Sequence, residues 1–106
     1  MSKDQKVVLQ SEARKLWREW TGKDIPKGYE VHHRHPKEAA HLYDEYPNDP
    51  SNLRLVKTEI HWLIHLVEGV FMGGRPLTKL NVDTVTPALD KEFPRQMQKP
   101  PKGSKP

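Results

Sequence analysis

Apolar side chains recur three and four positions apart over residues 5–20, near the start of the chain. Charged residues fall between them on the opposite side, which is the pattern of an amphipathic helix. Gly22 follows as a C-cap signal, and residues 23–28 are typical of a turn. The tryptophans of this segment are interpreted as core residues, with base stacking as the minority alternative. The predicted core-facing residues are Leu9, Ala13, Leu16, Trp17 and Trp20.

The hydrophobic period then changes to two, as in a half-buried strand. Tyr29 and Val31 are the apolar positions, and Pro36 ends the run. His32 and His33 therefore lie at the end of a predicted strand with their side chains on opposite faces. Two adjacent imidazoles placed in this way can take two different roles.

A second strand and a helix are predicted after a polar loop, residues 37–51. Thr58 is a suitable N-cap, and Glu59 in the first turn suits the helix dipole, so a helix is expected to start there. The strand is marked by Leu53, Leu55 and Val56. The apolar positions of the helix are Ile60, Leu63, Ile64 and Val67.

Histidine is concentrated around these elements: five of the six histidines lie in the two ends of the segment 28–65. His61 and His65 are four residues apart, so they project from one face of the predicted helix, close enough to hold one ion. A lone histidine on an apolar helix is more often a core side chain than a ligand. The four-residue spacing, together with the upstream His-His pair, favours a metal chelate.

The pattern after this helix is weaker. Gly73-Gly74 ends it, and Thr86 can cap a short helix with Pro87 at its first position, running to Pro94. From Gln98 onward the chain is basic and rich in proline, with nothing to bury. Residues 98–106 are therefore expected to be a disordered tail.

Size and composition predict one small α+β domain, residues 1–97. The chain has 106 residues, of which 34% are hydrophobic, so its core is expected to be thin and a bound metal would help to hold it together. The chain contains no cysteine, which excludes disulfides and thiolate zinc sites and leaves histidine as the main ligand type.

Charge and hydropathy add less. The formal net charge of +4 fits a polyanionic partner without requiring one. The N-terminus is too polar for a signal peptide, and no run of about 18 apolar residues is present, so no transmembrane segment is expected. A cytoplasmic location, or delivery into a target cell, follows as the expectation.

Several separated residues together resemble the HNH (His-Me finger) endonucleases, most closely the nuclease domain of DNase colicins and S-type pyocins. The likeness covers about a third of the chain, and residues 73–106 lie beyond it. It implies a ββα-metal core at about residues 28–72, preceded by the amphipathic helix and followed by a C-terminal extension. The matching residues are Tyr29-Glu30-Val31-His32-His33, Pro36, Asn52-Leu53-Arg54, His61 and His65.

The resemblance implies a single divalent ion as cofactor, Zn²⁺, Mg²⁺ or Ni²⁺, held by His32, His61 and His65. Three imidazoles from two elements are a common ligand set for zinc or nickel and leave a position open for water or phosphate.

The resemblance also implies the catalytic residues. His33 would be the general base, and Asn52 would hold the loop that orients it. Glu30 matches an acidic position that the bacteriocin nucleases need for activity. The alternatives are a second-shell or solvent-facing His33 and an Asn52 that only favours a turn. His35 and His41 have no counterpart in the family; His41 is interpreted as a solvated loop residue, and His35 as one that could face DNA.

As the family implies, the protein would hydrolyse DNA phosphodiester bonds with little sequence specificity, with RNA left open as a substrate. Arg34, Arg54 and Arg75 are candidates for phosphate contacts, each weighed against an ordinary surface arginine. A bacteriocin-like toxin would require an acidic inhibitor (immunity) protein as a partner. The alternatives are a phage or mobile-element nuclease, a non-catalytic zinc-stabilised nucleic-acid module and a structural partner-binding domain.

Overall fold

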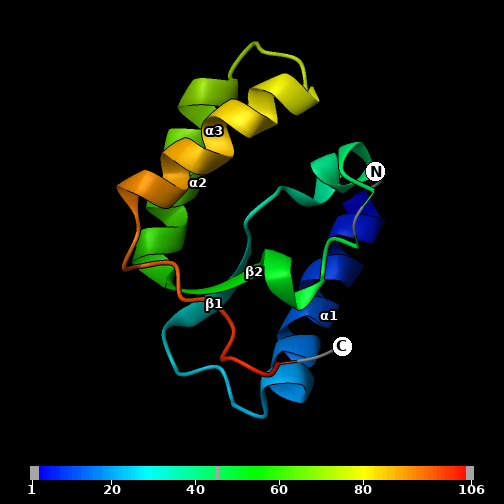
Figure 1. The fold of residues 1–106 in the computed structure, drawn as a ribbon, viewed down its shortest axis with the longest axis vertical. Coiled ribbons are helices and arrows are strands. Elements are labelled where there is room, and N and C mark those ends of the chain that lie inside the picture. The colour runs from blue at the N-terminus through cyan, green and yellow to red at the C-terminus, as the bar shows by residue number, and fades with distance from the viewer. Residues whose placement is uncertain (1–2, 45, 105–106) are drawn as a thin grey trace.

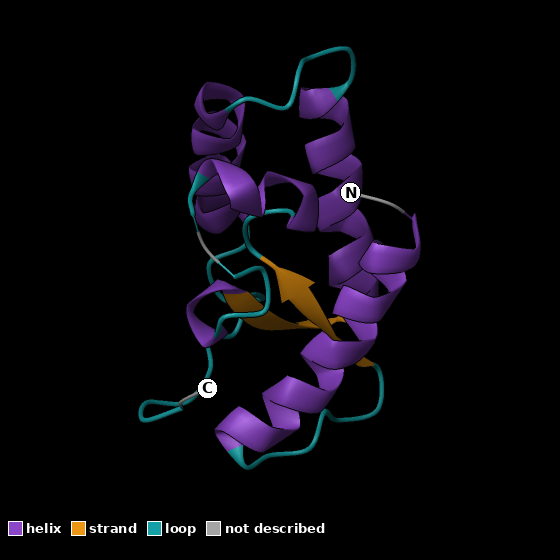
Figure 2. Cartoon of the chain, turned by 90° about the vertical axis from the view of Figure 1, so that its right-hand side faces the viewer, coloured by secondary structure: helices purple, strands orange, loops and turns teal. Residues whose placement is uncertain are grey.

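Two antiparallel strands lie between helices on either side in the computed structural model, which describes residues 3–44 and 46–104. The α+β class is as the sequence predicted. Figures 1 and 2 show α1 against one side of the sheet, with α2 and α3 beside each other on the other side. The elements are α1 (Lys3–Thr21), β1 (Tyr29–His33), the 3-10 helices η1 (Lys37–Leu42) and η2 (Pro50–Asn52), β2 (Leu53–Lys57), α2 (Thr58–Met72) and α3 (Lys79–Glu92).

The register of the sheet decides which residues face which helix. Tyr29 pairs with Lys57, and the register runs through His32 opposite Arg54 to His33 opposite Leu53. Because side chains alternate along a strand, His32 and His33 lie on opposite faces, as the sequence predicted.

One face of the sheet packs on α1. Gly22, at a φ of 70°, ends that helix as the sequence predicted, and its N–H donates to the carbonyl of Arg18. The Trp17 side chain is only 4% exposed, so it is a core residue; Trp20 is partly buried beside it. Together the buried members of this cluster are Ala13, Trp17, Val31, Leu53 and Leu55.

The other face packs on α2 and α3 through a second cluster, made of Val56, Ile64, Val85, Leu89, Phe93 and Met97. Most of this cluster lies after residue 72, so the C-terminal extension supplies much of the core that covers the sheet. Of the predicted apolar face of α2, Ile64 is buried and Ile60 packs against the cluster. Leu63 and Val67 are 38% and 43% exposed.

α2 starts at Thr58, as the sequence predicted, but the N-cap role predicted for Thr58 is wrong. Thr58 is the first helical residue and Lys57 the N-cap, which makes no side-chain capping bond. The Thr58 hydroxyl donates instead to the carbonyl of Gly28, 3.1 Å away, and its backbone N–H donates to the same oxygen. This threonine therefore ties the start of α2 to the turn before β1.

The prediction of a short helix capped by Thr86 is also wrong. α3 begins at Lys79, with Thr78 as N-cap accepting a bond from the Asn81 N–H, and Pro87 lies inside the helix. Proline removes one backbone bond from a helix interior. The helix nonetheless continues, because Val82, Val85 and Leu89 are buried on both sides of this position.

The chain after α3 returns to the sheet. Gln98 pairs antiparallel with Leu55 through two backbone hydrogen bonds of 2.8 and 3.0 Å. The first residue of the expected tail is thus held on the edge of β2, and the last two, 105 and 106, lie outside the described residues. Within the described ranges, no helix combines the length and apolar character needed to cross a membrane.

Candidate metal centre and catalytic cleft

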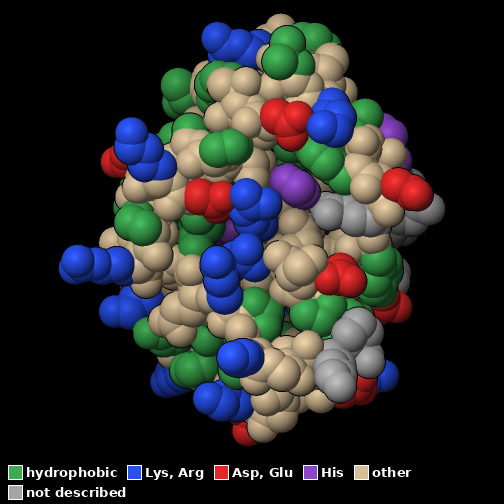
Figure 3. Space-filling model, viewed as in Figure 1, with side chains coloured by type: hydrophobic (Ala, Val, Ile, Leu, Met, Phe, Trp, Pro, Cys, Tyr) green, Lys and Arg blue, Asp and Glu red, His purple; other side chains and the backbone are tan. Residues whose placement is uncertain are grey.

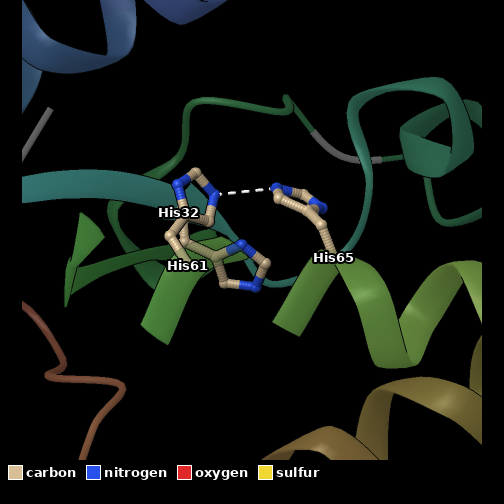
Figure 4. A group of neighbouring side chains, drawn as sticks. All are labelled: His32, His61 and His65. Carbon is tan, nitrogen blue, oxygen red and sulfur yellow. Dashed lines mark hydrogen bonds between the residues drawn. The ribbon is translucent and has the colours of Figure 1, made fainter. Parts of the chain in front are cut away.

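Three imidazoles from two elements converge at one point. His32 comes from β1, and His61 and His65 come from successive turns of α2 (Figure 4). Each offers a ring nitrogen, and these nitrogens all lie within 4.8 Å of one another. The Nε2 atoms of His61 and His65 are 2.8 Å apart, so one of the two rings donates a hydrogen bond to the other.

Local structure explains this convergence. His32 points to the face of the sheet that α2 covers, because Val56 on that face packs on Ile64 of α2. Buried Ile64 fixes the rotation of the helix about its axis. His65 follows Ile64 directly, and His61 precedes it by three residues. The rotation set by Ile64 therefore turns both imidazoles toward the end of β1.

Two carboxylates contact the far nitrogens of the helix imidazoles. Glu30 accepts a short hydrogen bond from Nδ1 of His61, and a Glu68 oxygen lies 3.6 Å from Nδ1 of His65. A proton held on Nδ1 leaves the Nε2 lone pair of His61 free to bind an ion. Carboxylate partners of this kind orient metal-binding histidines and raise their basicity. Glu30 therefore acts through His61 in this geometry. Glu68 was missed in the sequence, although its spacing of three residues from His65 was a usable signal.

Burial keeps His32 and His61 neutral. His32 is 2% exposed, and its desolvation, together with the nearby His61 and His65, holds its pKa well below the usual value. Burial also lowers the pKa of His61, while the Glu30 carboxylate partly opposes this effect. Only a neutral imidazole can bind a metal ion. His32 and His61 are therefore in the metal-binding protonation state at neutral pH.

The donor set fits a borderline divalent ion. Three imidazole nitrogens without thiolate suit zinc, nickel or copper better than magnesium, which prefers oxygen.

His33 lies on the other side of the strand end and is 6% exposed. Its Nε2 is 2.6 Å from Oδ1 of Asn48, a fully buried residue of the loop after η1. Since an amide oxygen can only accept, His33 donates from Nε2, and its Nδ1 carries the lone pair. Nothing in the sequence distinguished Asn48 from a turn residue.

The environment of His33 also sets its basicity. Burial lowers its pKa to about 4, an effect that the Asn48 bond partly opposes and the Lys37 charge reinforces. His33 is thus unprotonated at neutral pH, as a base must be, but it is weaker than an exposed imidazole.

Asn52 bonds both chain segments that flank His33. Its Oδ1 accepts from the His35 N–H at 2.7 Å, and its Nδ2 donates to the carbonyls of His35 and Pro47 at 3.1 and 2.9 Å. Asn52 is 2% exposed, so these bonds also satisfy a buried amide. The Asn52 side chain thus links the end of the strand that carries His33 to the loop that carries Asn48.

His33 and the two helix imidazoles open onto one cavity of about 230 Å³. Lys37 lies on its wall, and its Nζ donates to Oε1 of Gln10 in α1 at 3.3 Å. This ammonium places a positive charge on the cavity wall, and sequence analysis did not select it. The cavity is lined by Gln10, His33, Pro36, Lys37, Glu38, His61, His65 and Glu68.

The three candidate arginines differ in their surroundings. Arg34 is paired with Asp90 of α3, with Nε and Nη2 at 2.9 and 2.6 Å from Oδ2. Arg54 is 8% exposed, so the alternative of an ordinary surface arginine is wrong for this residue. Arg75 bonds the Phe71 carbonyl at the end of α2 and lies over its ring, and it lines neither the His33 cavity nor the one beside Arg54.

The two remaining histidines are outside the cluster. His35 stacks on Tyr43 with ring centroids 4.2 Å apart, and His41 is exposed on η1. A comparison of the chain with protein-family models, with curated proteins and with solved structures finds no match. The likeness to HNH endonucleases therefore rests on the motif residues of the sequence.

Proposed function

We propose that this protein is a metal-dependent endonuclease of the HNH (His-Me finger) type that hydrolyses DNA phosphodiester bonds with little sequence preference. One observation carries the proposal. The His32, His61 and His65 nitrogens lie within 4.8 Å of one another, and a fourth imidazole, His33, opens onto the same cavity as the two helix ligands. A zinc-stabilised binding module would need the first three residues but not the fourth.

The division of roles follows from the hydrogen bonds. His33 donates from Nε2 to Asn48, so Nδ1 is the atom that takes a proton from the attacking water. Glu30 holds the proton on Nδ1 of His61 and so directs Nε2 toward the ligand cluster. When bound there, a divalent ion would supply electrostatic stabilisation of the charge on phosphorus and on the leaving 3′ oxygen.

Lys37 adds a positive charge at the cavity wall, opposite the helix ligands. A phosphodiester that enters the cavity brings a negative charge, so this ammonium would favour its binding near His33. Contacts of this kind go to the backbone rather than to bases, which is the physical basis of the expected low sequence preference.

The proposal is tested by nicking of a supercoiled plasmid with Mg²⁺, Ni²⁺ or Zn²⁺, each with and without EDTA. Wild type is expected to cut with at least one ion and to stop in EDTA. His33→Ala should lower the rate by about 10² or more, the usual contribution of a positioned general base, with little loss of metal affinity.

His41→Ala is the matched control, because it removes an exposed imidazole that lines no part of the cavity. It should cut as fast as wild type. Zinc binding without any cleavage would leave the non-catalytic module as the better explanation. Cleavage at the wild-type rate by His33→Ala would place the base elsewhere.

A further inference from the structure

Arg54 is the only candidate arginine that is buried, and among the described residues the nearby carboxylate, Asp90, acts on its charge without bonding to it. Its Nη1 donates to the carbonyls of Ser51 and Leu53 at 2.9 and 2.8 Å. Within residues 3–44 and 46–104, no carboxylate bonds to this guanidinium. Burying a charge is costly unless an opposite charge compensates it. An unpaired guanidinium beside a cavity therefore points to a ligand that carries negative charge.

The cavity beside Arg54 has the matching shape and charge. It measures about 350 Å³ and lies between β2, the end of α3 and the segment that follows. Arg34 and Lys99 add two further cations to its wall. Of the described residues that line it, Asp90 alone carries a carboxylate, and this carboxylate is already bound by Arg34. Three cations against one carboxylate leave two positive charges facing the cavity.

The basic character continues past Arg54. A second cavity of about 350 Å³ is lined by Pro50, Ser51, Arg54, Lys99, Pro100, Pro101, Gly103 and Ser104. Figure 3 shows lysine and arginine side chains gathered near the middle of this face, next to a histidine. The two cavities form a basic track with Arg54 and Lys99 in common.

We propose that this track, the Arg54–Lys99 site, binds a phosphate group of the nucleic-acid strand whose neighbouring phosphodiester lies in the His33 cavity. The inference rests on the proposed nuclease function and assigns a role to the C-terminal extension. Asp90 and Lys99, with Phe93, Pro94 and Met97 between them, lie beyond the HNH-like segment and build the outer wall. The anion is thus held between the motif and the extension.

The register of the sheet supports a polymer rather than a free anion. Arg54 is the direct cross-strand partner of His32. One residue of the Arg54–Lys99 site therefore lies beside one residue of the metal-ligand cluster in the sheet. Opposite residues of an antiparallel pair have Cβ atoms about 4.5–5.5 Å apart. A single phosphodiester strand can therefore reach both places, whereas orthophosphate can occupy only one.

The test uses Lys99→Gln, because Arg54 is buried and its replacement could unfold the protein. Binding of a fluorescein-labelled 12-base-pair duplex is measured by anisotropy over a salt series, in a His33→Ala background with zinc present. A gel confirms that the duplex stays uncut. Lys99→Gln should weaken binding several-fold and reduce the slope of log K against log salt by about 0.9, the change expected for one lost phosphate contact.

Two further variants distinguish binding at the Arg54–Lys99 site from a general effect of the protein's net charge. Lys102→Gln makes the same charge change three residues away at a side chain that lines neither cavity, so its effect should be less than half as large. Asp90→Asn removes the carboxylate from the wall and should tighten binding. Equal losses in Lys99→Gln and Lys102→Gln, or weaker binding in Asp90→Asn with an unchanged melting temperature, would overturn the site.

Orthophosphate, titrated by calorimetry, distinguishes the two sources of the anion. A loss of orthophosphate binding in Lys99→Gln, with duplex binding unchanged, would overturn the nucleic-acid assignment. The nuclease and the site can fail separately. Duplex binding that depends on Lys99 without any cleavage overturns the nuclease alone, and cleavage with duplex binding independent of Lys99 overturns the site alone.

Discussion

At the scale of single residues, this protein uses pairs of side chains in which one acts and the other fixes its orientation. His33 has Asn48, His61 has Glu30, and the loop that carries Asn48 is tied down by Asn52. Asn48, Glu30 and Asn52 are not among the described residues that line the His33 cavity. The reactive lone pairs are consequently defined before any ligand binds, which lowers the cost of binding one.

Replacing Glu30 by Ala should weaken zinc binding by about 10- to 100-fold, the usual effect of removing a carboxylate behind a histidine ligand. The reason is that Nδ1 of His61 then loses the acceptor that keeps its proton there. Competition with a chromophoric chelator measures the affinity. Glu59→Ala removes an exposed carboxylate from the first turn of the same helix and should bind zinc like wild type. Equal affinities for Glu30→Ala and wild type would show that another group holds this proton.

At the scale of elements, α2 is the part on which the site depends, since it carries two ligands and is anchored by one buried residue. Ile64 is fully buried between the sheet and α3, whereas Val70, two turns further along, is 77% exposed. The helix is apolar on nearly all sides, so its sequence alone did not reveal which side is the core.

Ile64→Ala should lower the free energy of unfolding by about 2–5 kcal/mol, because it leaves a cavity in the core. Val70→Ala, the matched control, should change it by about 0.5 kcal/mol or less. Urea unfolding of both variants, without metal, makes the comparison. Similar losses for the two would mean that α2 is rotated relative to the sheet from the geometry described.

The hydrophobic periodicity of the sequence predicted the elements whose buried face can be recognised from neighbouring residues alone. The alternation of Tyr29 and Val31 predicted β1, and the spacing of Ala13 and Trp17 predicted the core face of α1. The sequence did not predict the full length of α3. Pro87 indicates a helix start, but the burial of Val82, five residues before it, stabilises a helix that begins earlier.

The residues of the candidate site also fall into those that the sequence predicted and those that it did not. The three imidazoles that converge were predicted from the four-residue spacing and the strand end. Asn48 and the Arg54–Lys99 site were not, since each depends on contacts between segments that are distant in sequence. A polar loop residue has no periodic signal that distinguishes a buried amide from an exposed one.

At the scale of the whole molecule, the thin core is divided between two faces of a two-stranded sheet, and buried imidazoles lie at the strand end. His32, His33 and His61 all have a pKa lowered by burial. Their protonation is therefore linked to folding.

Without metal, the free energy of unfolding should fall as the pH drops below about 6.5. In the unfolded chain histidine takes up a proton near pH 6.5, whereas folded His33 does so only at about 4. The unfolded state therefore binds more protons across this window, and stability is lost between these pH values and constant above them. Urea unfolding at pH 7.5, 6 and 5 measures the slope. His33→Ala should reduce it and His41→Ala should not; a flat profile in wild type would contradict the burial of these rings.

Metal should stabilise the folded chain, because the ligands join the end of β1 to α2 and the unfolded chain has no such site. An ion at 100 times its dissociation constant adds about 2.7 kcal/mol, which for a domain of this size raises the melting temperature on the order of 10 °C. Differential scanning fluorimetry with Zn²⁺ or Ni²⁺, and again after EDTA, measures the shift. His65→Ala should lose most of it, whereas His41→Ala should keep it. Because this experiment needs no substrate, a melting temperature that is the same with zinc and with EDTA would remove the metal centre itself, and the nuclease proposal with it.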